Sequence, residues 1–268
     1  MTDIRGVVIG IVKDIDDPIG EGRIRVLFPW LSDDELSGWA PIARTMAGKE
    51  RGFWYMPELE DEALVAFEHG DFDHPFVIGF LHNGVDTPPD DGIDAKVRRV
   101  RTVSGHVLEF DDRAGKQRIH LQTHDGHHLT MEDAPGTVVI ESAGGQRIRM
   151  EDRPGKITLS TKAGSTVQID DVPSSIQVKT TAGVTVAVED AGGVTVTAPA
   201  GSLTVNCLTA TINAMSTCSV NAPIVTVSGA AVAINSAIAT FSGVVQCSTL
   251  ITNAVVSQAY TPGLGNIW

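Results

Sequence analysis

The sequence predicts an all-β protein with two parts, a small N-terminal barrel and a long repetitive β-structure. Three observations support this prediction. Short runs of β-branched and aromatic residues, separated by Gly, Pro and Asp, fill residues 4–81 without a helical period. A repeat of about 19 residues fills residues 104–197. A shorter repeat of about seven residues then continues to residue 258.

The N-terminal part is expected to be a barrel over residues 1–83. About five strands that close on one apolar interior fit a small barrel of the OB type. These strands are expected at GVVIGIVKDI, GRIRVLFPW, RGFWYMP, EALVAFE and HPFVIGFL. Residues 84–103 are rich in Pro, Asp and Gly at their start, and we expect them to form a linker between the two parts.

The longer repeat, over residues 104–197, is defined by glycines that are each followed seven residues later by an aspartate. The glycines are Gly105, Gly126, Gly145, Gly164 and Gly183, and the aspartates are Asp112, Asp133, Asp152, Asp171 and Asp190. Apolar and polar residues alternate within each unit, which predicts a strand, a turn and a strand. At Asp152 to Gly155, the sequence DRPG predicts a turn with positive φ at the glycine and an aspartate side chain that caps it.

The shorter repeat predicts a structure that needs partner chains. An apolar residue followed by Asn or Ser recurs from Val205 to Ser242 at steps of seven or eight residues. Each unit gives one short strand and a corner, so a lone chain would leave both strand edges unpaired. Three copies wound about one axis would pair these edges and enclose the apolar residues, so we expect an intertwined trimeric β-helix over residues 104–258. For the longer units, a single-chain β-helix remains the alternative.

Charge is distributed unevenly along the chain. The first 90 residues hold 18 acidic and 7 basic residues, and the last 78 residues hold neither kind. This pattern lacks the clustered Lys and Arg that bind nucleic acid, so no nucleic acid partner is expected. The start of the chain lacks the features of a signal peptide, so we expect synthesis in the cytoplasm. The three cysteines, Cys207, Cys218 and Cys247, have no spacing that suggests a metal site.

Carboxylates and histidines are the candidates for chemistry. The acidic pairs recur in equivalent turns, whereas catalysis needs two carboxyls in different environments, so we interpret them as turn residues rather than as a catalytic or calcium site. Histidines cluster at His120, His124, His127 and His128. Alternation places His120 and His128 on the outward face, where they would be solvated; a metal or anion site on a trimer axis is the alternative. The Ser-rich repeats have no base beside them, so we expect no catalytic residue and no cofactor.

Aromatic residues cluster in the barrel region. They are Trp30, Trp39, Phe53, Trp54 and Tyr55. We interpret them as packing in the barrel core and between subunits. A stacking platform for sugars or bases is the alternative.

Several short motifs occur in a fixed order in the barrel region, and they resemble a known family. They are Gly22-Arg23-Ile24-Arg25-Val26 with Phe28-Pro29-Trp30, Gly38-Trp39-Ala40, Ala47-Gly48 with Arg51-Gly52, Pro57-Glu58, Asp61-Glu62, Phe67-Glu68 with Gly70-Asp71, and His74-Pro75 through Gly79. In order and spacing they resemble the OB domain of the central spikes of contractile injection machines. That family includes contractile phage tail spikes, VgrG proteins of type VI secretion and spikes of extracellular injection particles. Residues 104–112 and the turn repeats resemble the start of its β-helix.

The resemblance implies a non-enzymatic homotrimer whose barrels form a collar and whose β-helices form a needle in front of the tail tube. The linker is too short for the lysozyme-like domain that some members carry there. The chain starts almost directly at the barrel, so the resemblance implies a separate hub protein, as for the stand-alone spikes called baseplate assembly protein V. We expect assembly into the baseplate of a phage tail, a secretion system or an injection particle. The alternative function is a trimeric carbohydrate-binding or depolymerising tail-associated β-solenoid, although residues 121–240 contain no Trp, Tyr or Phe.

The last ten residues, 259–268, leave the repeat and predict a docking tip. The expected partner-binding residues are Pro262, Gly263, Leu264, Gly265, Asn266, Ile267 and Trp268. Three copies would bring these apolar ends to one apex, and an exposed apolar cluster usually binds a partner. We expect a PAAR-type tip protein or an effector there, with self-plugging of the needle as the alternative. Transient contact with a target membrane fits the absence of charge, because a charge brought into hydrocarbon is costly. An absence of structural need for charge explains it equally well.

Overall fold

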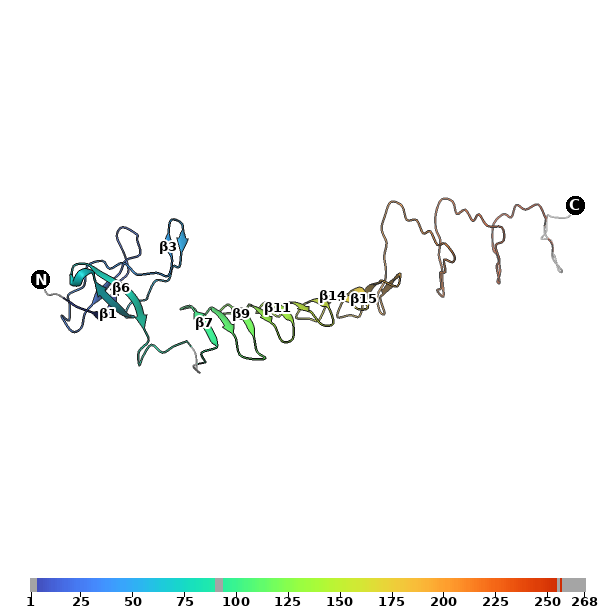
Figure 1. Ribbon diagram of the computed structural model, residues 1–268. Coiled ribbons are helices and arrows are strands. Elements are labelled where there is room, and N and C mark those ends of the chain that lie inside the picture. The colour runs from blue at the N-terminus through green and yellow to red at the C-terminus, as the bar shows by residue number, and fades with distance from the viewer. Residues whose placement is uncertain (1–3, 90–93, 255, 257–268) are drawn as a thin grey trace. The chain divides into compact units, whose positions relative to one another are not determined.

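The computed structural model describes residues 4–89, 94–254 and 256, and these residues divide into two units between Thr204 and Val205. Strands and turns make up almost all of the first unit (Figure 1). The only helical element among the described residues is a 3-10 turn, Glu68–Gly70. An all-β fold is therefore confirmed.

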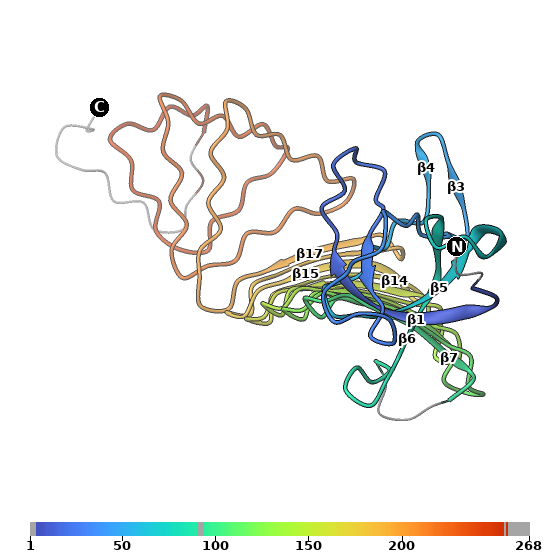
Figure 2. The same ribbon diagram turned by 90° about the vertical axis from the view of Figure 1, so that its left-hand side faces the viewer.

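The barrel region is built on a four-stranded antiparallel sheet in the order β2-β1-β5-β6. The strands are β1 (Val7–Asp14), β2 (Arg25–Leu27), β5 (Glu62–Phe67) and β6 (Pro75–Leu81). A separate hairpin, β3 (Ala47–Gly48) and β4 (Arg51–Gly52), projects from it (Figure 2). Apolar side chains from alternate positions form one core, whose buried members are Val12, Ile24, Val26, Phe28, Ala40, Ala63, Val65, Phe67 and Val77.

Three of the five predicted barrel strands are confirmed, and two are shorter than expected: GRIRVLFPW keeps only the three residues of β2. Only two residues of RGFWYMP, Arg51 and Gly52, form a strand. The following aromatic residues, Phe53 to Tyr55, are exposed and lie outside any strand. Local sequence could not reveal this difference, because aromatic residues are enriched in strands.

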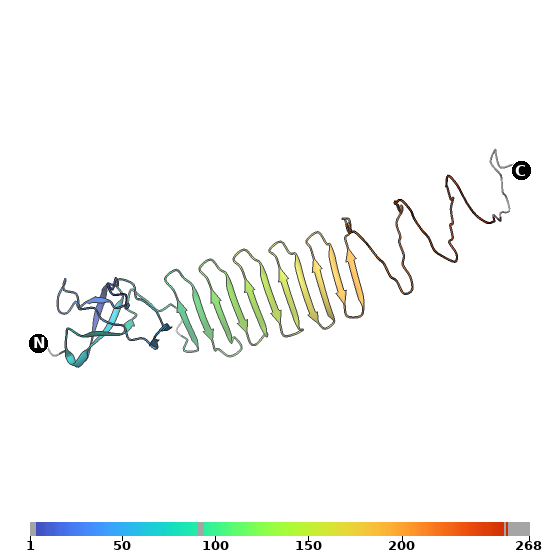
Figure 3. The same cartoon turned by 90° about the horizontal axis from the view of Figure 1, so that it is seen from above.

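The repeat region forms one antiparallel sheet of 11 strands in which every strand pairs with the next along the chain (Figure 3). The strands are β7 (Val97–Arg101), β8 (Val107–Asp111), β9 (Arg118–Gln122), β10 (His128–Glu132), β11 (Thr137–Glu141), β12 (Arg147–Glu151), β13 (Lys156–Ser160), β14 (Thr166–Asp171), β15 (Ser174–Lys179), β16 (Thr185–Glu189) and β17 (Gly193–Thr197). The first of them lies inside the segment expected to be a linker.

The expectation that this region pairs its strands between chains is wrong for residues 97–197. Each strand from β8 to β16 has both neighbours within the same chain, so its backbone groups are satisfied there. Alternation of polar and apolar residues shows which residues share a face. It does not show which chain supplies the next strand.

The repeat glycines sit in five equivalent turns along one margin of the sheet. Their φ angles lie between +80° and +97°, a region that glycine enters readily because it has no Cβ. A Ser or Thr three residues before each glycine fixes the turn: its side-chain oxygen accepts an amide hydrogen bond of 3.0–3.2 Å from the residue after the glycine. These hydroxyl residues are Thr102, Thr123, Ser142, Thr161 and Thr180.

The turns at the other margin differ from expectation in the role of aspartate. Gly155 has positive φ, as predicted, and so does Gly136 in the equivalent turn one repeat earlier. In the described chain, however, the carboxylates of Asp152 and Asp171 make no hydrogen bond to their own turns. Each lies against the glycine of the preceding repeat: a Cβ on Gly155 would meet the Asp171 carboxylate at 2.5 Å. Only glycine, which has no Cβ, therefore leaves room for the aspartate side chain of the following repeat.

Residues 205–254 form no strand within the chain, and every one of them is exposed. The seven-residue units thus find no pairing partner inside the described chain. This agrees with the prediction that a lone copy leaves their edges open, while the trimeric β-helix itself stays a prediction for this segment.

Candidate interaction surfaces

One face of the 11-stranded sheet is apolar over its length. Two continuous rows of side chains cross it, because facing residues of paired strands share a face. The first row is Phe110, Ile119, Met131, Val138, Met150, Ile157, Ile169, Ile176, Val188 and Val194. The second row is Val100, Leu108, Leu121, Leu129, Ile140, Ile148, Leu159, Val167, Val178, Val186 and Val196.

Most members of the two rows are exposed in the single chain; Ile157 is 39% exposed and Leu159 is 41% exposed. Burying one such side chain is worth roughly 1.5–3 kcal/mol. A contiguous apolar face of this extent marks an interaction surface, because monomeric proteins rarely leave one open to water. A groove of about 450 Å³ runs over part of the second row, between Ile140 and Val178.

The opposite face of the sheet is polar and rich in ion pairs. At its start Glu109, buried in the sheet, accepts hydrogen bonds from Arg99 at 2.5 Å and Arg118 at 2.7 Å. Burial alone would raise the pKa of Glu109, but these two guanidinium groups hold it below its usual value. Asp111 is also buried, and the side-chain hydrogen bonds of Arg113 hold the pKa of its carboxyl well below its usual range.

The histidine cluster divides between this polar face and the margin. His120 and His128 lie opposite the apolar rows, as predicted, with ring centroids 5.9 Å apart. They are half-buried rather than fully solvated: the His120 ring contacts Thr130 Oγ1 at 2.7 Å and Gln122 Oε1 at 2.9 Å. Across the described ranges, no three His, Cys, Asp or Glu side chains are grouped so as to hold a metal ion.

Two histidines have a structural role that sequence reasoning missed. The Nδ1 atom of His106 accepts the amide hydrogen of His124, and the Nδ1 atom of His127 accepts that of Ala143. Each histidine directly follows a repeat glycine and so links one turn to the next. This position after the repeat glycine is the sequence feature that could have predicted their role.

The aromatic residues of the barrel region are mostly on its surface, so their assignment to the core is wrong. Trp30, Phe53, Trp54 and Tyr55 are each about half exposed or more, and Trp39 is half-buried beside Arg23 and Arg25. The expected packing between subunits stays open, because only a second copy could bury them.

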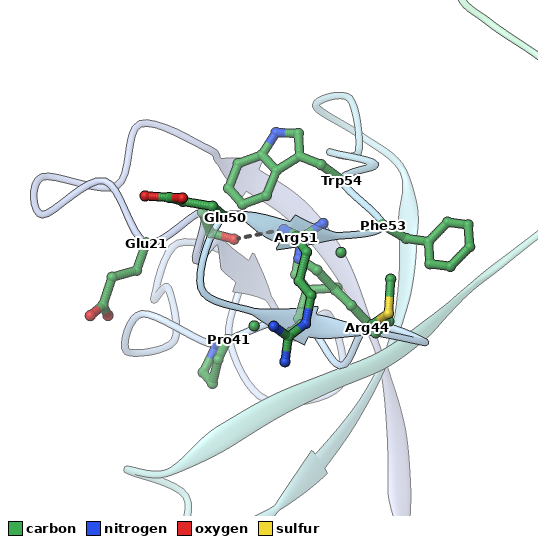
Figure 4. Close-up of a pocket in the computed structure, with 13 residues that line it drawn as sticks. Glu21, Pro41, Arg44, Glu50, Arg51, Phe53 and Trp54 are labelled. Atoms are coloured by element: carbon green, nitrogen blue, oxygen red, sulfur yellow. Dashed lines mark hydrogen bonds between the residues drawn. The ribbon is translucent and has the colours of Figure 1, made fainter.

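A pocket of about 520 Å³ lies beneath the β3–β4 hairpin (Figure 4). The Arg44 guanidinium lies 4.2 Å from the centre of the Trp54 ring, a cation–π contact, and its Nη1 donates to the Tyr55 carbonyl at 3.1 Å. The Trp54 ring covers Gly22, where a Cβ would come within 2.3 Å of it. Arg44, Trp54 and Gly22 therefore form a fixed wall of the pocket.

The docking tip predicted at Pro262 to Trp268 lies outside the described residues. Within the described part of the chain, no helix is long and apolar enough to cross a bilayer.

Comparison with known proteins relates the barrel region to injection machines. Residues 8–82 match the family model described as the type VI secretion system/phage-baseplate injector OB domain. Similar proteins include the actin cross-linking toxin VgrG1 of Vibrio cholerae serotype O1, 31% identical over 110 residues, which are 37% of this chain and 10% of that protein. The type VI secretion system spike protein VgrG3 of the same species is 32% identical over 110 residues, 37% of this chain and 11% of that protein.

A third relative is the type VI secretion system spike protein VgrG1a of Pseudomonas aeruginosa, 33% identical over 125 residues, 42% of this chain and 19% of that protein. The chain thus spans between 10% and 19% of the length of these curated relatives. The matched OB domain, with the buried core that builds it, makes residues 8–82 of this chain similar to the OB domain of VgrG and phage-baseplate spike proteins.

Proposed function

We propose that the protein is the structural, non-enzymatic central spike of a contractile injection machine. Three copies would pack their sheets face to face around one axis, and the machine would be a phage tail, a type VI secretion system or an extracellular injection particle. The observation that carries the proposal is the two-row apolar face of β7 to β17, which follows an injector OB domain in the same chain. A rigid shaft behind a baseplate domain is the arrangement that a spike requires.

The trimer explains both parts of the repeat region. Three apolar faces turned inward would remove the rows from water and leave the ion-paired faces outside. Residues 205–254, which find no strand partner in one chain, would pair with the same residues of the other two copies. The needle would therefore start as three separate sheets and continue as an interwound shaft.

The remaining partners follow from the two ends of such a spike. The OB domain would contact the hub protein and the tail tube at the baseplate, where the protein is assembled after synthesis in the cytoplasm. The far end would carry a PAAR-type tip protein or an effector on Pro262 to Trp268. Residues 191–268 contain no charged side chain, so they could pass a target membrane without burying a charge in hydrocarbon.

The trimer is tested by sedimentation of the full chain. We expect a mass of three times 28.4 kDa. Ile157→Asp should abolish the trimer, because it would bury three carboxylates in an apolar interior. The neighbouring Thr158→Asp is the control: Thr158 lies on the polar face, so this variant should remain trimeric.

A stably folded monomer of the unmodified chain would overturn the trimer and the spike with it. Co-purification with baseplate hub and tube proteins tests the place in the machine, and variants lacking residues 262–268 should lose the tip partner while keeping the hub. Release of reducing sugar from capsule or cell-wall material would instead support the carbohydrate-degrading alternative.

A further inference from the structure

We propose that the barrel regions of neighbouring copies contact each other through two complementary surfaces of the same domain. The first, which we call the basic pocket, consists of Arg44, Arg51, Phe53 and Trp54 from the pocket lining, together with Lys49 in the turn between β3 and β4. The second, the acidic loop, consists of residues 30–35. The inference rests on the proposed trimer and names the contact that would close its collar.

The basic pocket concentrates unpaired positive charge on an acidic domain. Only seven of the first 90 residues are basic, and Arg44, Lys49 and Arg51 are three of them. Two other cations of the domain are paired with carboxylates: Lys13 lies 2.7 Å from Glu60, and Arg23 lies 2.7 Å from Asp17. The described structure gives no carboxylate within ion-pair distance to any of the three pocket cations.

Exposed apolar groups accompany these cations. Phe53 is 48% exposed and Trp54 is 63% exposed, and both line the pocket. In Figure 4 the Trp54 ring caps the Arg44 guanidinium, while the Arg51 side chain points to another side of the pocket. Two carboxylates, Glu21 and Glu50, are also in the lining, and Glu21 lies 3.7 Å from Arg23. Trp and Arg are the residues most often found at the centre of protein interfaces.

The acidic loop has the complementary composition. Asp33, Asp34 and Glu35 form an uninterrupted acidic run, all three are exposed, and within the described chain none pairs with a cation. Trp30 and Leu31, beside them, are about half exposed. The loop is nevertheless ordered, because the Ser32 hydroxyl accepts the amide hydrogens of Asp34 at 3.2 Å and Glu35 at 3.1 Å.

Charge and apolar surface therefore match between two different patches of one domain. Opposite charges across an interface set its register and suppress wrong partners. A contact between two different patches repeats from copy to copy, and a closed rotation turns it into a ring. A second copy of this chain supplies three carboxylates and two apolar side chains together, which complement the three cations without an ion pair and the two exposed rings of the basic pocket.

Zero-length cross-linking tests the contact in the assembled full chain. A carbodiimide joins a lysine amine to a carboxylate only where the two touch. Two differently tagged versions are co-expressed and mixed trimers are isolated: one carries Lys49→Arg, and the other carries Asp33→Asn, Asp34→Asn and Glu35→Gln. In neither version can Lys49 be linked to the acidic loop of the same chain. Every mixed trimer nevertheless contains one Lys49 that faces an unchanged acidic loop on a copy of the other version.

We expect mass spectrometry to find Lys49 joined to Asp33, Asp34 or Glu35 in the mixed trimers. The Lys13 to Glu60 cross-link within each chain is the positive control, since both Glu60 oxygens lie 2.7 Å from the Lys13 nitrogen. Trimers that give the control product without the Lys49 product, or that join Lys49 to a carboxylate outside the loop, overturn this contact and leave the spike intact. Monomeric chains overturn both.

Discussion

Buried carboxylates are the individual side chains that depend most on their partners. Asp111 is 2% exposed and Glu109 is 4% exposed, and guanidinium groups satisfy both. The pKa of each lies below its ordinary value because arginine hydrogen bonds favour the charged form. A lowered pKa in the folded chain adds stability above the unfolded value of about 4, and that stability is lost as the pH falls toward the lowered value.

Asp111→Asn should therefore reduce stability at pH 7 and flatten its decline in acid. The amide keeps the shape of the side chain but loses the charge that the Arg113 guanidinium pairs with. Thermal unfolding followed by circular dichroism between pH 7 and pH 2.5 measures this. Asp125→Asn is the matched control, because Asp125 is exposed in a nearby turn and has no ion pair in the described chain. Identical acid profiles for Asp111→Asn and the unmodified chain would show that the carboxylate contributes nothing.

The sequence predicted individual strands and turns better than it predicted how they contact one another. The alternation in the 19-residue units correctly predicted strands and turns, and the glycines correctly predicted positive φ. The Asp152 cap was wrong because its contact partner, Gly136, lies in the preceding repeat, beyond the reach of local turn rules. Likewise Phe53 and Trp54 are of residue types that usually lie in a core, and only their position beside the β3–β4 hairpin leaves them exposed.

The hydroxyl residues of the five turns give a test of what holds one repeat together. Thr161→Val removes the side-chain acceptor of the Ser165 amide at 3.1 Å while keeping the side-chain shape. We expect a loss of roughly 1 kcal/mol in the free energy of unfolding, the usual net worth of one such hydrogen bond. Thr181→Val in the next turn is the control, because no hydrogen bond of the Thr181 side chain is found in the described chain. Equal losses for the two variants would argue that Thr161 acts only through β-propensity.

The chain combines two regions that differ in how their backbone groups are paired. Strands β8 to β16 have hydrogen-bonded neighbours on both sides in one chain, whereas residues 205–254 form no strand in it. Sequence periodicity revealed both repeats. It could not distinguish strands that pair within one chain from strands that need partner chains, because the seven-residue and the longer units show the same alternation of apolar and polar residues. The predicted docking tip likewise rests on sequence alone.

Amide hydrogen exchange distinguishes the two regions directly. Peptides from residues 97–197 should be protected by pairing within the chain, and in the assembled trimer peptides from residues 205–254 should be protected as well, because the other two copies would supply their partners. Ile157→Asp should be monomeric, because a trimer would bury its charge. In this variant the second group should exchange at the rate of an unfolded chain while the first retains part of its protection. The contrast matters more than either value, because a general loss of fold would affect both groups alike. Fast exchange of residues 205–254 in a chain that sediments as a trimer would show that the copies associate through their sheets alone and that the interwound shaft does not form.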